Sequence, residues 1–384
     1  MKTDKIKSAI SAVATCSLLG IVSLAPLAQI ANAEVTAPVG YVKLTFNAES
    51  DTPFSLPLNR PKAYSGQVVT ISGNTINIAD ADFTASELVY ADGTQNEKYY
   101  LLFTTGELEG RTFDVTANGT DSITVNQDGD TDVQTLFTSP ATDSFEIRPH
   151  WTLNTMFPNG DNFDKSTNAF SPSGLIMVRS ETEPGEFVPV TTTYMYYDSN
   201  TNADDGWYNA NDLGAGKASD TVLKQTVFYV CKNKSLTNYT VNLVGDVPLT
   251  DRKVSLRLNA DGAKQGNYIA LAFPIEMSLA DSNLSTTSGF KKSTDPFSID
   301  GDRVLAYADN IIGYNPAPIT VYIYFDSSDD GQDGWYDAND LAAGKQGSSM
   351  VFKPGKGYII SKQDDFEEII QWNINLPYNA FIEN

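Results

Sequence analysis

A segment of 24 residues occurs twice in this chain, 128 positions apart. The first copy runs from Tyr194 to Lys217 and the second from Tyr322 to Lys345, and 15 of the 24 aligned positions are identical. Solenoid repeats recur every 20 to 50 residues or so, which is far shorter than this distance. The repeat therefore predicts a duplicated domain or two halves of one sandwich. Any fold of this chain must contain two copies of the structure that the segment forms.

Each copy has the composition of a β-hairpin. Aromatic and β-branched residues precede Asp198 and Asp326, and strands favour such residues. A run of Asp, Asn, Ser and Gly follows, which is typical of turns. The Gly-Trp-Tyr triplets at 206–208 and 334–336 then begin a second ordered segment. We predict a hairpin with a long acidic tip in each copy.

The acidic tips are candidate calcium loops. Oxygen-bearing side chains recur with roughly the spacing of an EF-hand loop, and such oxygens suit Ca²⁺. The candidate ligands are Asp198, Asn200 and Asn202 in the first copy, and Asp326, Ser328, Asp330 and Asp337 in the second. No amphipathic helix flanks either copy, so the hypothesis is an irregular site. The alternative is that these acids are solvated turn residues.

The repeated tryptophans allow two interpretations. Trp207 and Trp335 could stack on sugar rings if they stand exposed beside the acidic tips. In an alternating strand they could equally be core residues, which is the more common use. Packing requires the same residue in both copies of a duplicated fold just as a ligand would.

The beginning of the chain has the pattern of a secretory signal peptide. Three lysines precede a stretch without charge that closes with Ala-Asn-Ala at 31–33. We predict residues 1–33 as the signal peptide and export to the extracellular space or cell surface, with the periplasm as an alternative. No later apolar run reaches the roughly 20 residues that a spanning helix needs, so no transmembrane segment is expected.

Charge limits the possible partners. The formal charge is −22, and removal of three Lys and one Asp with the signal peptide takes it to −24. Such a chain repels phosphate backbones, so nucleic acid is not an expected partner. Cys231 alone remains after processing, which excludes an internal disulfide and favours a small buried core residue.

The predicted fold class is all-β throughout. Residues 34–148 alternate around hairpin signals such as Ser72-Gly73-Asn74 and Asn118-Gly119, which predicts a small barrel or sandwich domain. The first β repeat is predicted at 149–250 and the second at 251–384. Within them, the strand at 174–178 is aligned with 303–307, and the segment 223–232 with 352–361.

The chain resembles an uncharacterised family of secreted, repeat-containing β proteins found mainly in Verrucomicrobia and related bacteria. The segments that carry the resemblance include PVGYVKLTF at 38–46, FPIEMSLADSNL at 273–284, the two GWY hairpins and PGKGY at 354–358. The resemblance implies a signal peptide and a repeated β architecture, and it implies no activity.

The sequence has few marks of an enzyme. His150 is the single histidine, and no GxSxG, HExxH or CxxC motif occurs. A pair of carboxylates could still serve a glycosidase, so a hydrolase remains a third hypothesis. We expect a secreted non-enzymatic structural, adhesive or matrix protein without a certain cofactor, with polysaccharide or other envelope proteins as partners. The alternative is an extracellular carbohydrate-binding protein.

Overall fold

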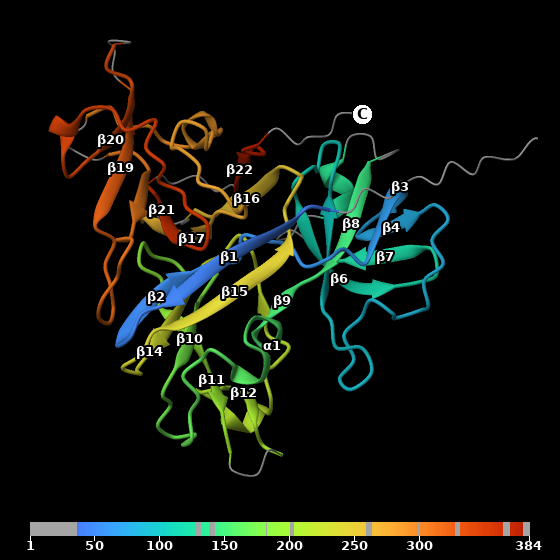
Figure 1. Ribbon diagram of the computed structural model, residues 1–384. Helices are drawn as coiled ribbons and strands as arrows, with labels where there is room; N and C mark the ends of the chain where they lie inside the picture. Colours follow the sequence, from blue (N-terminus) through green and yellow to red (C-terminus); the bar gives the residue numbers. More distant parts are fainter. Residues whose placement is uncertain are drawn as a thin grey trace, which may run out of the picture. The chain divides into compact units, whose positions relative to one another are not determined.

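The computed structural model describes residues 37–126, 132–137, 143–181, 183–199, 203–258, 263–295, 297, 300–326, 331–363 and 369–378. Within these ranges the regular secondary structure consists almost entirely of strands, and the predicted all-β class is confirmed (Figure 1). The helical elements are short: α1 (Leu153–Met156) and the 3-10 turns Val133–Leu136, Pro158–Gly160, Leu213–Ala215, Leu284–Thr286 and Leu341–Ala343. None of the helices in the described ranges has the length and apolarity that crossing a membrane demands.

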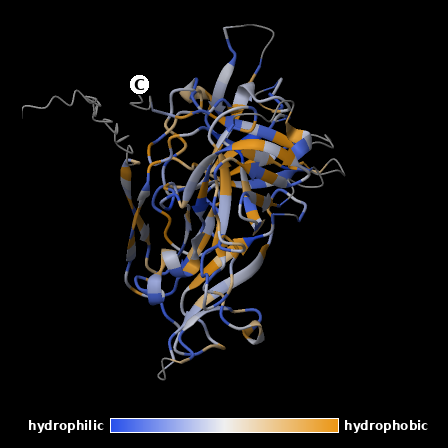
Figure 2. Cartoon of the chain, turned by 90° about the vertical axis from the view of Figure 1, so that its right-hand side faces the viewer, coloured by the Kyte–Doolittle hydropathy of each residue, from blue (hydrophilic) through white to orange (hydrophobic). Residues whose placement is uncertain are grey.

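Six strands close into a small barrel in the order β3-β4-β7-β6-β5-β8. They are β3 (Tyr64–Ser72), β4 (Thr75–Ile78), β5 (Tyr99–Phe103), β6 (Thr112–Asn118), β7 (Ser122–Val125) and β8 (Ser144–Pro149). The predicted turns at Gly73 and Gly119 join β3 to β4 and β6 to β7. Buried apolar side chains such as Ile76, Leu101 and Ile123 fill the interior. Hydropathy alternates along these strands, because successive side chains point inward and outward (Figure 2).

The rest of the described chain forms two units with the same strand plan. The first unit contains β2 (Ser50–Phe54), β10 (Leu175–Arg179), β11 (Val190–Tyr197), β12 (Gly206–Asn209) and β14 (Tyr229–Asn233) in one sheet. The second contains β17 (Gln265–Ala270), β18 (Arg303–Ala306), β19 (Thr320–Phe325), β20 (Gly334–Asp337) and β21 (Gly357–Lys362). The strand orders, β12-β11-β10-β14-β2 and β20-β19-β18-β21-β17, correspond element by element.

Each unit also has a two-stranded antiparallel ribbon. In the first unit β1 (Val39–Phe46) pairs with β15 (Tyr239–Asp246), and in the second β16 (Arg252–Leu256) pairs with β22 (Ile370–Ile374). The short strands β9 (Trp151–Thr152) and β13 (Val222–Leu223) complete the first unit. The second unit has the single bridge Met277 to Phe352 at the equivalent place.

The predicted boundary between the N-terminal domain and the first repeat is corrected by this pairing. Residues 34–148 were expected to form one domain, but β1 and β2 pair with β15 and β14 and not with any barrel strand. The barrel is thus inserted into the first unit between β2 and β9. Alternation along a strand indicates which side chains face inward, but it does not say which strand is the partner.

The predicted alignment of the central strands is also shifted by one residue. Ile176 pairs with Tyr194 and Cys231, and Val304 pairs with Tyr322 and Ile360, so Ile176 and Val304 are equivalent. The sequence alignment had placed Leu175 opposite Val304. The equivalence of Cys231 with Ile360 holds, and Cys231 is buried, with burial raising the pKa of its thiol well above the usual value.

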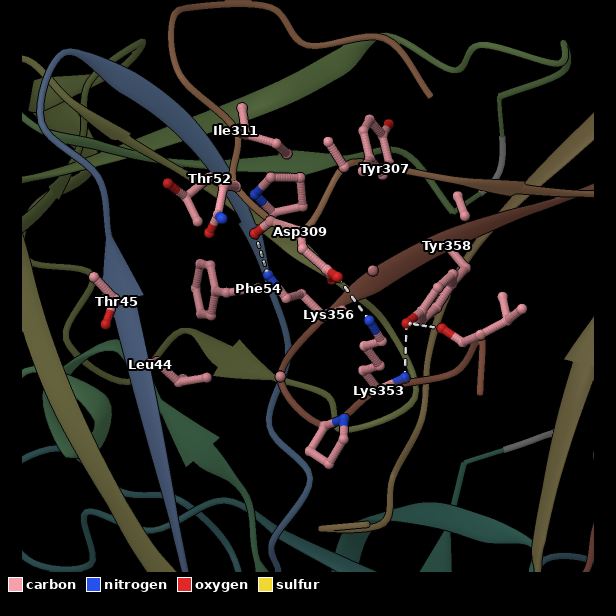
Figure 3. Close-up of a pocket in the computed structure, with 18 of the residues that line it drawn as sticks. Leu44, Thr45, Thr52, Phe54, Tyr307, Asp309, Ile311, Lys353, Lys356 and Tyr358 are labelled. Atoms are coloured by element: carbon pink, nitrogen blue, oxygen red, sulfur yellow. Dashed lines mark hydrogen bonds and ion pairs between the residues drawn. The ribbon is translucent and has the colours of Figure 1, made fainter. Parts of the chain in front are cut away.

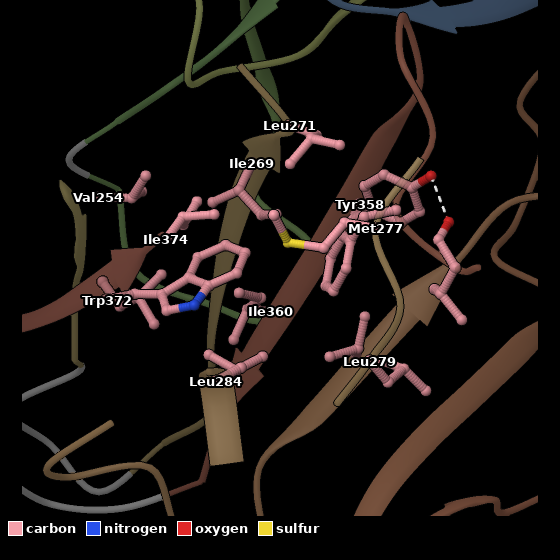
Figure 4. Close-up of a cluster of buried hydrophobic side chains, with 14 of the residues drawn as sticks. Val254, Ile269, Leu271, Met277, Leu279, Leu284, Tyr358, Ile360, Trp372 and Ile374 are labelled. Atoms are coloured by element: carbon pink, nitrogen blue, oxygen red, sulfur yellow. Dashed lines mark hydrogen bonds between the residues drawn. The ribbon is translucent and has the colours of Figure 1, made fainter. Parts of the chain in front are cut away.

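Each unit has its own apolar core. In the second unit Trp372 from β22, Ile360 from β21 and Leu279 surround a common centre (Figure 4). A further cluster contains residues of both units, among them Phe228, Val230, Leu305 and Ile359. These come from the sheet faces opposite the two cores, so the sheets of the two units pack against each other through this cluster.

Candidate functional site

The bases of the two acidic hairpins are built alike. Lys165 Nζ lies 4.0 Å from Oδ2 of Asp198, and Lys292 Nζ lies 3.0 Å from Oδ2 of Asp326. The hydrogen bond from Lys292 to Asp326 raises the pKa of the lysine against the opposing effect of burial. Each ammonium also lies over a tyrosine ring of its own hairpin. Asp198 and Asp326, the first candidate calcium ligand of each acidic tip, therefore each have a cation beside them.

The calcium hypothesis stays a prediction. Asn200, Asn202, Ser328 and Asp330 lie outside the described residues. Oδ1 of Asp337 accepts a hydrogen bond from the backbone N–H of Asn339, as in an ordinary Asx turn. Across the ranges that are described, no group of three or more His, Cys, Asp or Glu side chains is placed to hold a metal ion.

The tryptophans are core residues, which corrects the hypothesis that they stack on sugars. Trp207 is 0% exposed and Trp335 is 2% exposed. Trp207 packs against Phe163 and Tyr196, and Trp335 against Phe290 and Tyr324. A ring without an exposed face cannot stack on a ligand. In the alternating strand the neighbouring Tyr208 and Tyr336 point the other way and are half-buried.

One cavity of the described residues lies where the second unit meets β1 and β2 of the first, and we call it the Asp309 cavity (Figure 3). It has a volume of about 540 Å³. Leu44 and Phe54 form one side, and Asp309, Lys353 and Tyr358 form the other. The two units come close together at Gly355. Its φ is +73°, and a Cβ there would lie 2.4 Å from Leu44, so the position requires glycine.

The polar groups of the Asp309 cavity hold one another in place. Lys353 Nζ lies 2.7 Å from Oδ2 of Asp309, and Lys356 Nζ donates to the backbone carbonyl of Asp309 at 2.8 Å. The hydrogen bond from Lys353 lowers the pKa of Asp309, and burial lowers the pKa of Lys356. The Tyr358 hydroxyl accepts from the backbone N–H of Lys353 at 2.7 Å and donates to the carbonyl of Val351. An apolar wall thus faces a charged pair.

A second cavity of about 310 Å³, which we call the Arg252 cavity, occupies the reciprocal place. Here Lys224 and Glu181 of the first unit form an ion pair of 2.8 Å and face β16 and β17 of the second. Lys224 is equivalent to Lys353, since Tyr229 accepts from the backbone N–H of Lys224 as Tyr358 does from that of Lys353. Barrel residues, including Tyr100 and Asp114, also line the Arg252 cavity.

His150 borders the Arg252 cavity and is buried. Its Nε2 lies 2.9 Å from Oδ1 of Asp114, and its ring packs against Tyr100 with 4.7 Å between centroids. Burial opposes ionisation of Asp114, but the hydrogen bond and charge of His150 prevail and lower the pKa of the carboxyl. No serine, threonine or cysteine of the described residues is hydrogen-bonded to this histidine side chain, so the geometry is that of a histidine and carboxylate pair without an adjacent nucleophile.

Sequence reasoning missed both cavities. Lys356 belongs to the PGKGY segment, which is typical of a turn entering a strand, and Lys353 directly precedes it. Arg252 precedes an ordinary strand pattern. The repeat itself was the signal that could have indicated both cavities. When two equivalent units pack together, the same segment of each unit contacts the other unit. Comparison of the chain with protein-family models, with curated proteins and with solved structures finds no match.

Proposed function

We propose that the protein is a secreted structural or adhesive protein that acts at the cell surface or in the extracellular matrix without catalysing a reaction. The observation that carries this proposal is the burial of Trp207 and Trp335 at equivalent places. These two identical residues serve to build the cores of the two units. Retention of shape is expected where the shape itself is the function.

Other equivalent contacts support the same conclusion. The hydroxyls of Tyr229 and Tyr358 each accept from a backbone N–H, at 2.6 and 2.7 Å. The ion pairs Lys165 with Asp198 and Lys292 with Asp326 stabilise the two hairpin bases. By contrast, the tips differ in sequence between the copies. The features that recur are those that hold strands together.

Export is inferred from the leader at 1–33, and the resemblance to secreted β proteins agrees with it. The charge of −22, which becomes −24 without the leader, suits a soluble chain outside the cell, where acidic surfaces prevent self-association. The proposed partners are matrix polysaccharide or other envelope proteins.

The experiment has two arms. The full chain is produced in an exporting bacterium, and the N-terminus of the exported product is sequenced, with Glu34 expected. The purified product is then sedimented with extracellular matrix material from producing cells, and its hydrolysis of a panel of chromogenic glycosides and esters is measured. Co-sedimentation without turnover supports the proposal. Hydrolysis that a His150→Gln or Asp114→Asn variant abolishes would overturn the proposal and show that the protein is an enzyme.

Carbohydrate binding is the alternative, and the Asp309 cavity is the observation that favours it. Tyr322, which is partly exposed, lines this cavity beside the polar pair Asp309 and Lys353. Aromatic faces next to charged hydrogen-bonding groups are the usual composition of a sugar site. Glycan-array binding that Asp309→Asn removes, and that the hairpin variant Asp212→Asn retains, would favour this alternative. Loss of binding with both variants would point to general charge instead.

A further inference from the structure

The Arg252 cavity has a charge opposite to that of the whole chain. The protein has 48 Asp and Glu against 26 Lys and Arg. Among the residues that line this cavity the ratio reverses, with six cationic side chains and two carboxylates. The cationic residues are Arg111, Arg179, Lys224, Arg252, Lys253 and Arg257, and the acidic ones are Asp114 and Glu181. In a chain this acidic, such a concentration requires its own explanation.

Arg252 is the centre of the argument because it is buried with an unused donor. It is 2% exposed, and its Nη2 donates to Oδ1 of Asn59 at 2.9 Å. Its Nη1 is buried and has no hydrogen-bond partner. No carboxylate within the described ranges forms an ion pair with it. A buried charge in this condition is costly, since pairing and hydrogen bonding are what normally compensate for lost hydration.

Arg148 nearby shows how the same chain compensates a buried guanidinium. It is 4% exposed, and it forms ion pairs of 2.8 Å with both Glu146 and Asp246. Burial opposes its charged form, but these carboxylates raise the pKa of Arg148. At Arg252 burial prevails, and the pKa is lowered. Of these two buried arginines, Arg148 is paired with carboxylates of the described chain and Arg252 is not, and Arg252 borders a cavity.

A second guanidinium at the same cavity repeats the pattern. Arg179 stacks on Tyr268, with its Cζ 4.9 Å from the ring centroid, and its Nη1 donates to the carbonyl of Val188. Its Nε is buried without a partner. Two buried donors without a partner among the described residues therefore belong to arginines that line this cavity, and Tyr268 keeps one of the two guanidinium planes in place. Buried donors without a partner also occur outside the cavity, at Nε of Arg303 and at Nε1 of Trp207 and Trp335.

We propose that the Arg252 cavity binds an oxyanion, carried by a small acidic ligand such as a uronic acid residue of an anionic polysaccharide. Guanidinium groups recognise carboxylate, sulfate and phosphate oxygens through charge-assisted hydrogen bonds. A volume of about 310 Å³ exceeds that of a lone oxyanion, so the cavity has room for an oxyanion that is attached to a larger body. The proposal is independent of the Asp309 cavity, and it adds a ligand to the matrix role without resting on it.

The test measures binding calorimetrically with the full exported chain. The probes are trigalacturonate, neutral galactotriose, inorganic sulfate and inorganic phosphate at constant ionic strength. Trigalacturonate is expected to bind at one site per chain, and galactotriose is not. Equal binding of sulfate or phosphate with the same variant dependence also supports an oxyanion site and assigns the free ion as its source.

Variants locate the site. Arg257→Gln and Lys224→Gln are each expected to weaken trigalacturonate binding by about threefold to tenfold, and Arg252→Gln by about tenfold or more. Lys234→Gln, which removes a surface lysine outside both cavities, is the matched control and should bind as the wild type does. Because Arg252 is buried, its variant is first checked for folding, and the two partly exposed residues test the site if it unfolds.

Two results would overturn the proposal. One is the lack of binding of all three anions at concentrations of about 10 mM, which corresponds to a negligible affinity. The other is binding that Arg257→Gln, Lys224→Gln and a folded Arg252→Gln all leave unchanged, because the anion would then occupy another place.

Discussion

Phe228 and Gly357 occupy equivalent positions in the two units, one residue before Tyr229 and Tyr358, and they pack against each other. A Cβ built on Gly357 would lie 2.2 Å from Cγ of Phe228. The units therefore meet at a point where one copy has a large ring and the other has no side chain. The reciprocal backbone hydrogen bonds Ser55 N to Gly355 O and Ala270 N to Thr226 O flank this contact.

Replacing Gly357 should loosen the packing between the units. We expect Gly357→Ala to lower the free energy of unfolding by about 1 to 3 kcal/mol, the usual cost of an overpacked interior. Denaturant unfolding measures the effect. Gly347→Ala is the control, since its Cβ would lie 3.8 Å from the nearest atom, and it should leave stability nearly unchanged. An equal effect of both substitutions would show that the contact with Phe228 is not the cause.

The buried indoles predict a loss of stability upon their removal. We expect Trp207→Ala and Trp335→Ala each to destabilise the protein by about 3 to 5 kcal/mol, because each leaves a large cavity in a packed core. Phe170→Ala serves as the control, since this ring is 90% exposed. Thermal unfolding and near-ultraviolet circular dichroism measure both effects. Stability unchanged in the tryptophan variants would contradict their assignment to the core.

Asp300 gives a prediction about pH. The Ser293 hydroxyl donates to its Oδ1 at 2.6 Å and the Thr294 hydroxyl to its Oδ2 at 2.9 Å, and these bonds lower its pKa to about 2. A carboxyl whose pKa is lowered by folding contributes stability above the unfolded pKa, and that contribution is lost as the pH falls through the folded value. The free energy of unfolding of the Asp300→Asn variant should therefore fall less than that of the wild type as the pH is lowered from about 4 to about 2.

Urea unfolding of the wild type and the variant at several pH values checks this difference. Thr294→Val, which removes only one of the donors, should give an intermediate pH dependence. Parallel curves for all three proteins would contradict the role assigned to Asp300.

The calcium hypothesis predicts a melting shift that depends on the hairpin bases. If the acidic tips bind Ca²⁺, millimolar calcium raises the melting temperature, because a ligand of the folded state stabilises it. Asp198→Ala combined with Asp326→Ala should then abolish the rise. Magnesium at the same concentration controls for general screening of charge. Equal melting with and without calcium in the wild type would exclude these sites.

The sequence alone determined the local structure of this protein. Aromatic alternation around Tyr194 and Tyr322 predicts strands, and Gly73 and Gly119 predict turns in the barrel, because these properties depend on neighbouring residues only. The repeat likewise predicts two equivalent hairpins. It also shows that Trp207 and Tyr208 face opposite ways, since successive side chains of a strand alternate.

Tertiary structure decided the choice of partners. The pairing of β1 with β15 joins residues about 200 positions apart, and no local pattern specifies such a pairing. The same holds for the direction in which Trp207 faces, which depends on the side of the sheet that Phe157 and Phe163 cover. The Arg252 cavity needs the barrel, the first unit and the second unit at once. Its charge arises from residues brought together by folding, and proximity in space cannot be read from order along the chain.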